Sequence, residues 1–341
     1  MEKKNIDWAN LGFAYMPTDK RFVANFKDGA WDEGGLVDDP NVNLSECAGV
    51  IQYSQTVFEG LKAYTTEDGH IVTFRPDLNA ERIENSAKRL EIPVFKKERF
   101  IEAVKMVVEA NAAYVPPFGS GATFYLRPVL FATGPVIGVK PAQEYQFRLF
   151  GTPVGPYFKG GMKPLTLKVS DFDRAAPCGT GNIKAGLNYA MSLHAIVTAH
   201  DEGYDENMYL DAKTRTKVEE TGGANFLFVT KDGKVVTPKS DSILPSITRR
   251  SLIQVAKDYL GLEAEEREIH FDEVKDFAEC GLCGTAAVIS PVGKIVDHGK
   301  EICFPSGMQE AGPICKKLYD TLTGIQMGKI KAPEGWIYRI M

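Results

Sequence analysis

The chain lacks long apolar runs and an excess of positive charge. No hydrophobic stretch in its 341 residues approaches about 18 residues, the length that a membrane-spanning helix needs, so we expect no membrane partner. No apolar core follows the charged residues between Met1 and Asp7, so the N-terminus does not predict a secretory signal and we expect a cytoplasmic protein. The formal net charge is −5, whereas nucleic-acid-binding proteins are usually basic, so we expect no nucleic-acid partner.

Metal-binding patterns and several familiar catalytic motifs are missing as well. The five histidines show no metal-ligand spacing, and the chain has no H-E-x-x-H, G-x-S-x-G or P-loop sequence, so we expect no metal site. The six cysteines lie in a long chain without a signal sequence, which predicts free thiols. Cys280 and Cys283 form a C-x-x-C sequence, but Cys303 and Cys315 are twelve residues apart and do not complete a zinc site. We interpret Cys280 and Cys283 as two buried or half-buried free thiols, with a redox pair as the alternative.

A glycine-rich stretch around one lysine is the most informative segment present. Lys184 lies between Gly181 and Gly186, just before an apolar helical run that starts near Leu187, and no carboxylate occurs within five residues of it. Desolvation favours the neutral amine of a lysine, which is a nucleophile and forms Schiff bases with carbonyl substrates or with pyridoxal phosphate. The alternative is an ordinary solvated lysine at a helix start, as most lysines are solvated.

The length of the chain predicts two domains, because 341 residues are too many for one comfortable core. Strands and helices mix in both halves without a regular β-α-β alternation, which favours α+β domains. A Gly/Pro-rich stretch at 155–161 is the best linker candidate. We therefore expect a small N-terminal α+β domain at 1–152, a linker at 153–163, and a large C-terminal α+β domain at 164–341 that carries Lys184.

Three places in the sequence are candidates for binding a phosphate. A helix expected at 247–260 starts after Pro245 and Ser246, so its free N–H groups and macrodipole would attract an anion, although every helix has such an end. The small residues at 284–287, after a short helix expected at 272–280, form a second loop with exposed N–H groups. Arg75 stands between a strand end and a proline and suits bidentate contact with phosphate, with a surface ion pair as the alternative.

Two pairs of neighbouring polar residues are candidates for binding a ring or a carboxylate. Glu219 and Glu220 lie on a strand expected at 217–220 and point to opposite faces, so only one of them can face a pyridine nitrogen, unless both are simply solvated. Tyr125 and Arg127 lie on one face of a strand expected at 123–130 and would bind a substrate carboxylate together, unless Arg127 only extends from a half-buried strand to solvent.

Short segments along the chain, each weak by itself, form an ordered and specific set. They span about residues 50 to 320 and are QTVFEGLK at 55–62, Phe74–Pro76, YLRP at 125–128, Pro153–Gly155, Asn182–Tyr189, Glu220–Asn225, Leu244–Pro245 with its following helix, and Gly284–Ala286. The set resembles the branched-chain amino-acid aminotransferases, fold-type IV pyridoxal-phosphate enzymes, in their longer, eukaryotic-like branch. The resemblance implies a two-domain α+β fold of the D-amino-acid-aminotransferase type and the cofactor pyridoxal 5′-phosphate. It also implies transfer of an amino group between L-leucine, L-isoleucine or L-valine and 2-oxoglutarate.

The resemblance implies a role for each candidate residue. Lys184 would form the Schiff base with the cofactor and then move the proton of the substrate Cα. Tyr189 would hydrogen-bond the ring oxygen of the cofactor, and Glu220 would pair with the ring nitrogen. By the same resemblance, Arg75, Ile247, Thr248 and Thr285 would hold the phosphate, Tyr125, Arg127, Thr285 and Ala286 would bind substrate carboxylates, and Phe58, Tyr157 and Tyr53 would line an apolar pocket. Tyr53 and Val139 would reach in from the partner subunit, which implies a homodimer.

Other activities use the same fold and are the alternatives. A D-amino-acid transaminase or an aminodeoxychorismate lyase is the first, and the FEG sequence at 58–60 argues against it together with Tyr125 and Arg127. A catalytically silent ligand-binding relative is the second, and the presence of Lys184, Tyr189, Glu220 and Arg75 argues against that.

Overall fold

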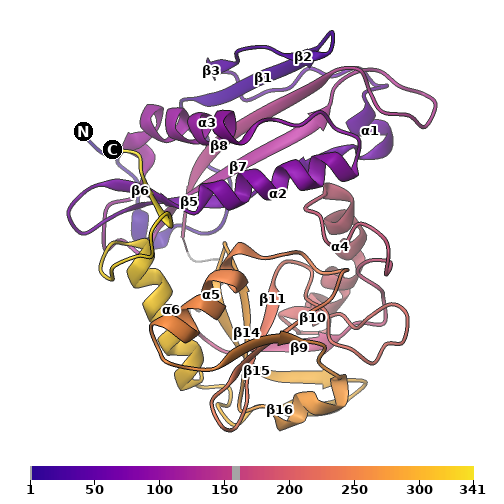
Figure 1. The fold of residues 1–341 in the computed structure, drawn as a ribbon, viewed down its shortest axis with the longest axis vertical. Coiled ribbons are helices and arrows are strands. Elements are labelled where there is room, and N and C mark those ends of the chain that lie inside the picture. Colours follow the sequence, from indigo (N-terminus) through magenta and orange to yellow (C-terminus); the bar gives the residue numbers. More distant parts are fainter. Residues whose placement is uncertain (1, 156–161) are drawn as a thin grey trace. The chain divides into compact units, whose positions relative to one another are not determined.

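The computed structural model describes residues 2–155 and 162–341. Its chain divides into two compact units, each with its own sheet (Figure 1). Unit 1 comprises Met1–Tyr157, Ile183–Leu187 and Ile325–Met341, and unit 2 comprises Phe158–Asn182 and Asn188–Gly324. The segments around Lys184 and at the C-terminus, which we expected in the second domain, therefore pack with the first half of the chain. The domain boundary at 152 stays a prediction, as does the linker at 153–163, part of which falls outside the described residues.

Unit 1 is built on a nine-stranded sheet with the order β17-β6-β5-β7-β8-β1-β2, in which β3 pairs with β1 and β4 with β7. All of these pairings are antiparallel. The strands are β1 (Arg21–Lys27), β2 (Ala30–Trp31), β3 (Gly35–Val37), β4 (Thr56–Phe58), β5 (Leu61–Thr65), β6 (Ile71–Phe74), β7 (Thr123–Ala132), β8 (Tyr145–Val154) and β17 (Ile337–Arg339). The helices are α1 (Gly49–Tyr53), α2 (Pro76–Arg89) and α3 (Lys97–Ala110), with short 3₁₀ helices at Trp8–Asn10 and Ala112–Tyr114.

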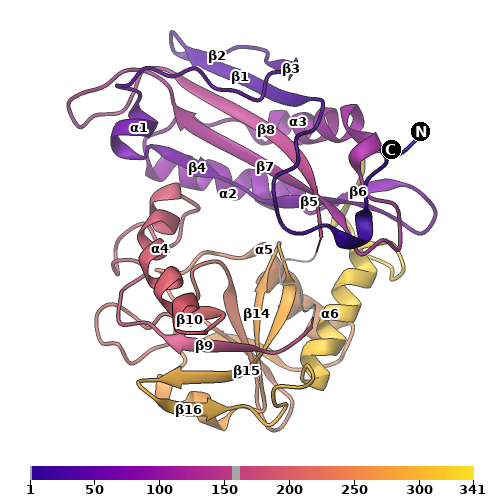
Figure 2. The same ribbon diagram turned by 180° about the vertical axis from the view of Figure 1, so that it is seen from behind.

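Helices α2 and α3 cover one face of this sheet, as Figure 1 and the opposite view in Figure 2 show. α2 starts with Pro76, whose missing N–H is not needed in a first turn, and buries Ala80, Ile83 and Ala87 on one stripe. Side chains alternate along β7, so Phe124 and Leu126 join the core under the helices. Tyr125 and Arg127 consequently lie on the other face of the sheet.

Unit 2 contains an eight-stranded mixed sheet with the order β10-β9-β15-β14-β11-β12-β13, in which β16 pairs with β15. The β10–β9, β9–β15 and β12–β13 pairings are parallel. The strands are β9 (Leu165–Val169), β10 (Glu206–Met208), β11 (Asn225–Val229), β12 (Val235–Pro238), β13 (Ala264–Arg267), β14 (Glu279–Gly284), β15 (Val288–Asp297) and β16 (Lys300–Cys303). The helices are α4 (Gly186–Asp201), α5 (Ile247–Asp258), α6 (Pro313–Gln326) and the 3₁₀ helix η3 (Phe271–Asp276).

Two expected elements of unit 2 differ in the structure. The helix expected at 272–280 is the 3₁₀ helix η3, which ends at Asp276, and Cys280 lies on β14 instead. The strand expected at 217–220 is a chain of isolated bridges, in which Val218 pairs with Leu210 and Glu220 with Asn225. Tertiary pairing decides the first case, because the hydrogen bonds of β14 with β11 and β15 override the local helical pattern. None of the described helices combines the length and the apolar character needed to cross a membrane.

Candidate active site

Lys184 is held in unit 1 through its backbone. Its N–H donates to the Ser86 hydroxyl over 3.0 Å, and its carbonyl accepts the Phe58 N–H over 3.0 Å. The next residue, Ala185, pairs with Val57 of β4 in an isolated antiparallel bridge. The position of the lysine backbone is therefore set by α2 and β4, two elements that the chain forms about a hundred residues earlier.

The Lys184 amine and the Arg127 guanidinium lie beside the same aromatic ring. Lys184 Nζ is 4.8 Å from the centre of the Phe58 ring, and Arg127 Cζ is 4.8 Å from that centre. Both are cation–π contacts, which favour these positions without using the hydrogen-bonding capacity of either group. The lysine side chain is half-buried. Unit 1 thus brings together Lys184, Phe58 and Arg127, which the sequence analysis assigned to one site.

Tyr125 and Arg127 face the same side of β7, as their spacing predicts. Arg127 Nη2 donates to the Tyr125 hydroxyl over 3.2 Å, and the guanidinium lies 5.4 Å from the centre of the tyrosine ring. Arg127 Nε is buried and, in the part of the chain that the structure describes, makes no hydrogen bond. The guanidinium therefore keeps donor capacity for an anionic ligand. A Cβ at Gly60 would lie 2.1 Å from the Tyr125 hydroxyl, so glycine at position 60 makes room for it.

Arg75 precedes α2 in a left-handed backbone conformation, with φ 47° and ψ 48°. This conformation is uncommon for a residue with a side chain and costs about 1–3 kcal/mol. The Arg75 N–H donates to the Trp336 carbonyl over 2.8 Å, and its guanidinium lies 4.5 Å from the centre of the Trp336 ring. The C-terminal segment and Pro76 together hold the buried Arg75 in this orientation.

The residues expected to reach into a partner subunit lie on the surface of unit 1. Val139 is 89% exposed, Tyr53 is 40% exposed, and the Tyr53 hydroxyl donates to the carbonyl of Ile137, which is itself 73% exposed. Exposed apolar side chains that gather in one contiguous patch are typical of interaction surfaces. The remaining residue of the expected apolar pocket, Tyr157, lies outside the described residues.

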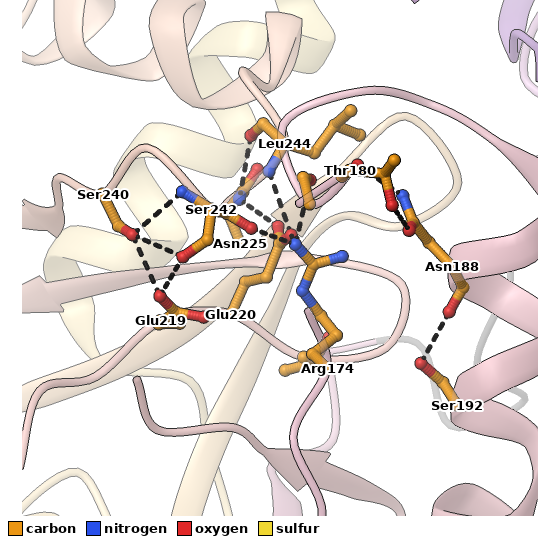
Figure 3. Close-up of polar contacts among 12 residues, drawn as sticks. Arg174, Thr180, Asn188, Ser192, Glu219, Glu220, Asn225, Ser240, Ser242 and Leu244 are labelled. Atoms are coloured by element: carbon orange, nitrogen blue, oxygen red, sulfur yellow. Dashed lines mark hydrogen bonds and ion pairs between the residues drawn. The ribbon is translucent and has the colours of Figure 1, made fainter. Parts of the chain in front are cut away.

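In unit 2, the Glu220 carboxylate is buried among hydrogen-bond donors (Figure 3). Arg174 Nη2 lies 2.7 Å from its Oε1, the Leu244 N–H donates to Oε1 over 2.9 Å, and Asn225 Nδ2 donates to Oε2 over 2.6 Å. Such donors, one of them a full positive charge, favour the ionised form of a carboxylate. Unit 2 therefore holds a buried negative charge at the position that the sequence analysis assigned to a ring nitrogen.

Arg174 also joins the glycine-rich loop to this carboxylate. Its Nη2 donates to the Gly181 carbonyl over 2.9 Å and to the Ser242 carbonyl. A Cβ at Gly181 would lie 2.0 Å from the Ser242 oxygen and 2.8 Å from Arg174 Nη2. Glycine at position 181 is thus required for the close approach of two loops.

Glu219 belongs to a different cluster from Glu220 (Figure 3). Its Oε1 accepts the Ser240 hydroxyl over 3.0 Å and the Ser242 hydroxyl, and the side chain is buried. The two glutamates thus point apart, as expected, although neither stands on a regular strand.

The candidate phosphate-binding groups of unit 2 are the start of α5 and the turn between β14 and β15. Ser246 caps α5 by accepting the Arg249 N–H over 3.1 Å, and Ile247 and Thr248 form the buried first turn. The N–H groups of a first turn have no acceptor within their own helix. Thr285 and Ala286 lie half-buried in the turn. Tyr189, in the first turn of α4, is half-buried as well.

The chain is similar to known aminotransferases over most of its length. The family described as amino-transferase class IV matches residues 56–295. A branched-chain-amino-acid aminotransferase of Haemophilus influenzae is 52% identical over 342 residues, which cover 99% of each chain. The chain belongs to the branched-chain aminotransferases of class IV.

Solved structures of branched-chain aminotransferases share its fold. The enzyme of the archaeon Thermoproteus uzoniensis, solved with norvaline, is 28% identical and superposes with a TM-score of 0.80, covering 95% of this chain and 100% of that one. The enzyme of Escherichia coli is 26% identical, with a TM-score of 0.78 over 95% of this chain and 99% of that one. A third branched-chain aminotransferase, complexed with N-(5′-phosphopyridoxyl)-L-glutamate, is 28% identical, with a TM-score of 0.75 over 93% of this chain and 98% of that one. The prediction of an α+β, fold-type IV aminotransferase is confirmed.

The C-x-x-C cysteines of this aminotransferase are structural thiols. Cys280 and Cys283 stand three residues apart on β14, so they point to opposite faces and their Cα atoms are roughly 10 Å apart, too far for a disulfide. Burial raises the pKa of Cys283 to about 12 and that of Cys280 well above its usual value. A raised pKa disfavours the nucleophilic thiolate, so burial and spacing favour two structural thiols over a redox pair.

Sequence reasoning missed two residues that contact the candidate site. Arg174 is a single arginine in an irregular loop, and no spacing or periodicity marks it as the partner of Glu220. Ser86 lies on the buried stripe of α2, where a serine is usually satisfied by the helix itself. The signal that would have found Ser86 is a polar residue among apolar neighbours on the core face of a helix.

Proposed function

We propose that this aminotransferase moves the amino group between L-leucine, L-isoleucine or L-valine and 2-oxoglutarate, giving branched 2-oxo acids and L-glutamate. Pyridoxal 5′-phosphate would be its cofactor, attached to Lys184. The observation that carries the proposal is the arrangement around Phe58, where the Lys184 amine and the Arg127 guanidinium each lie 4.8 Å from the ring centre. An amine on a fixed backbone beside an arginine with an unused donor suits a covalent anchor next to a carboxylate-binding group.

The residues of each unit fit this cofactor by their chemistry. In unit 2, the buried Glu220 carboxylate with its charged partner Arg174 suits a protonated ring nitrogen, and the start of α5 suits a phosphate. In unit 1, Lys184 supplies the amine and the buried Arg75 a second positive group. The complex of a solved relative with a phosphopyridoxyl compound supports the same assignment. When bound, the cofactor would supply the electron sink that makes the Cα–H bond of an amino acid acidic.

Lys184 would then act as an acid and a base. Its free amine would accept the proton from the substrate Cα as a base and then deliver that proton to C4′ of the cofactor as an acid. Tyr189 would donate its hydroxyl to the ring oxygen, and the ionised Glu220 would keep the ring nitrogen protonated. Arg75, Ile247, Thr248 and Thr285 would hold the phosphate and so fix the ring relative to the lysine.

Two kinds of side chain would share one substrate pocket. Tyr125 and Arg127, together with Thr285 and Ala286, would bind substrate carboxylates, including the second carboxylate of glutamate. Phe58, Tyr157 and Tyr53 would offer an apolar wall to leucine, isoleucine or valine. The two substrates bind in turn, as ping-pong chemistry allows, so one pocket serves both.

A homodimer belongs to the proposal. Tyr53 and Val139 would complete the pocket of the partner subunit, and their exposure on the surface of unit 1 supports this. A cytoplasmic location is part of the same proposal.

The proposal is tested with the purified protein loaded with pyridoxal 5′-phosphate. We expect a visible absorbance band that shifts on addition of L-leucine while 4-methyl-2-oxopentanoate appears. In Lys184→Ala, borohydride should no longer fix the cofactor to the protein, whereas the surface variant Lys168→Ala, which removes an ion pair with Glu202, should behave as the wild type. Cofactor still fixed by borohydride in Lys184→Ala would refute the assignment of the lysine.

The same protein distinguishes the alternative activities. A D-amino-acid transaminase would turn over D-alanine faster than L-leucine, which we do not expect because Tyr125 and Arg127 are paired on β7. A silent relative would bind the cofactor without consuming either amino acid.

A further inference from the structure

The Ser86 hydroxyl makes two hydrogen bonds, and one of them goes to Lys184. It donates to the Arg82 carbonyl one turn earlier in α2 over 2.9 Å and accepts the Lys184 N–H over 3.0 Å. Ser86 is fully buried. A serine inside a helix is satisfied by the first of these bonds alone, so the second is an additional contact across 98 residues of sequence.

The other side of the Lys184 backbone is fixed as well. Its carbonyl accepts the Phe58 N–H over 3.0 Å, and Ala185 bridges to Val57. A Cβ at Gly186 would lie 3.0 Å from the Thr56 methyl group, so the segment lies close against β4. Both polar groups of the lysine backbone are thus bound, one to a side chain and one to a neighbouring backbone.

A buried ion pair connects the two anchors. Glu59, which follows Phe58, is fully buried, and its carboxylate accepts from Arg82 Nε over 2.6 Å, from Arg82 Nη2 over 2.8 Å and from Asn79 Nδ2 over 2.7 Å. A bidentate pair of this kind holds α2 and the end of β4 in one orientation. Because the Arg82 carbonyl in turn accepts the Ser86 hydroxyl, the acceptor offered to Lys184 is itself fixed.

We propose that Ser86 is a positioning residue for Lys184. Its hydroxyl binds the lysine N–H and thereby fixes the direction in which the Lys184 side chain leaves the backbone, beside Phe58 and Arg127. The proposal rests on the role of Lys184 given above. Small errors in the placement of a reacting group cost large factors in rate, so the single hydrogen bond matters for turnover more than for substrate binding.

Ser86→Ala tests the proposal in the holoenzyme, with Ser251→Ala as the matched control. Ser251 is equally buried, and its hydroxyl donates to the Ile247 carbonyl one turn earlier over 2.8 Å. Ser251→Ala therefore removes the same kind of hydrogen bond within a helix as Ser86→Ala does. In Ser86→Ala we expect the Lys184 amide to exchange with solvent about tenfold faster and kcat with L-leucine to fall about tenfold, with KM changed less than about threefold. Ser251→Ala should leave both measurements near those of the wild type.

Ser86→Thr and Ser86→Cys keep the test decisive if the alanine variant does not fold. Threonine keeps the oxygen acceptor and should stay close to the wild type, whereas cysteine keeps the volume, replaces the oxygen with a weak acceptor and should resemble alanine. Unchanged exchange of the Lys184 amide in Ser86→Ala or Ser86→Cys would overturn the proposal, as would equal effects in Ser251→Ala. Amide exchange does not depend on the chemistry of the lysine side chain, so this failure differs from borohydride-fixed cofactor in Lys184→Ala, which refutes the proposed function.

Discussion

Arg174 and Glu220 form a buried ion pair in unit 2, with Nη2 2.7 Å from Oε1 and side chains only 6% and 4% exposed. The same guanidinium binds the carbonyls of Gly181 and Ser242. One cation therefore neutralises the carboxylate proposed for the ring nitrogen and ties together the loops around it.

Replacing Arg174 with methionine should be strongly destabilising. It leaves the Glu220 carboxylate buried beside Asn225 and Leu244 without its cation, and breaking a buried pair in this way costs about 3–5 kcal/mol. Urea unfolding of the cofactor-free protein measures the loss. The control is Arg215→Met, which removes a surface pair with Asp173 at 3.2 Å and should cost about 1 kcal/mol or less. Similar losses in the two variants would contradict the finding that Arg174 is the important partner.

Arg127→Ala should harm the reaction of glutamate more than that of leucine. Glutamate has a second carboxylate for the guanidinium to bind, and a charge-assisted hydrogen bond contributes about 1.5–3 kcal/mol. We therefore expect kcat/KM for glutamate to fall at least about tenfold further than kcat/KM for leucine. Arg127→Lys keeps the charge and loses the fork geometry, so its kcat/KM for glutamate should lie between those of the wild type and Arg127→Ala. Equal losses of kcat/KM with both substrates would contradict the role assigned to Arg127.

The buried Lys62 on β5 should make the folded state more stable at high pH. Burial lowers the pKa of Lys62 from 10.5 to about 8, so the unfolded chain binds one more proton than the folded chain between these values. The cost of the buried cation, up to about 3 kcal/mol, is fully present below pH 8 and disappears as the pH rises towards 10.5.

Lys62→Met provides the comparison. Its free energy of unfolding should exceed that of the wild type by up to about 3 kcal/mol at pH 7, and the difference should shrink as the pH rises towards 10. Urea titrations at a series of pH values measure it. A difference that does not change with pH would show that packing, and not charge, is responsible.

The buried Glu206 on β10 should make the folded state less stable as the pH rises from 4.5 to about 7. Burial raises the pKa of Glu206 from 4.5 to about 7, so the folded chain binds more protons than the unfolded chain between these values. The folded state therefore loses up to about 3 kcal/mol as the pH rises from 4.5 to 7, and the loss is complete above pH 7. Glu206→Gln should be near neutral at pH 4 and more stable than the wild type at pH 8. The same gain at both pH values would rule out ionisation of Glu206 as the cause.

Local sequence rules predicted much of this molecule. The period of two along β7 predicted that Tyr125 and Arg127 share one face, and they do. The adjacency of Glu219 and Glu220 predicted that their side chains point apart, and they contact different residues. The family and its α+β fold also followed from ordered short segments. The helix expected at 272–280 was wrong because β11 and β15 pair with the residues from Glu279 onward, a contact that no local pattern contains.

The sequence by itself was enough to single out the glycine-rich stretch around Lys184, the order of the motifs and the side chains that share one face of a strand. These features depend on neighbours a few residues apart. Only the tertiary structure decided that the Lys184 backbone is held by Ser86 and Phe58, and that Arg174 is the cation beside Glu220. These contacts join residues that are from tens to more than a hundred positions apart. They form because each buried N–H, carbonyl and charge needs a partner, and which partner is near depends on how the sheets and helices pack.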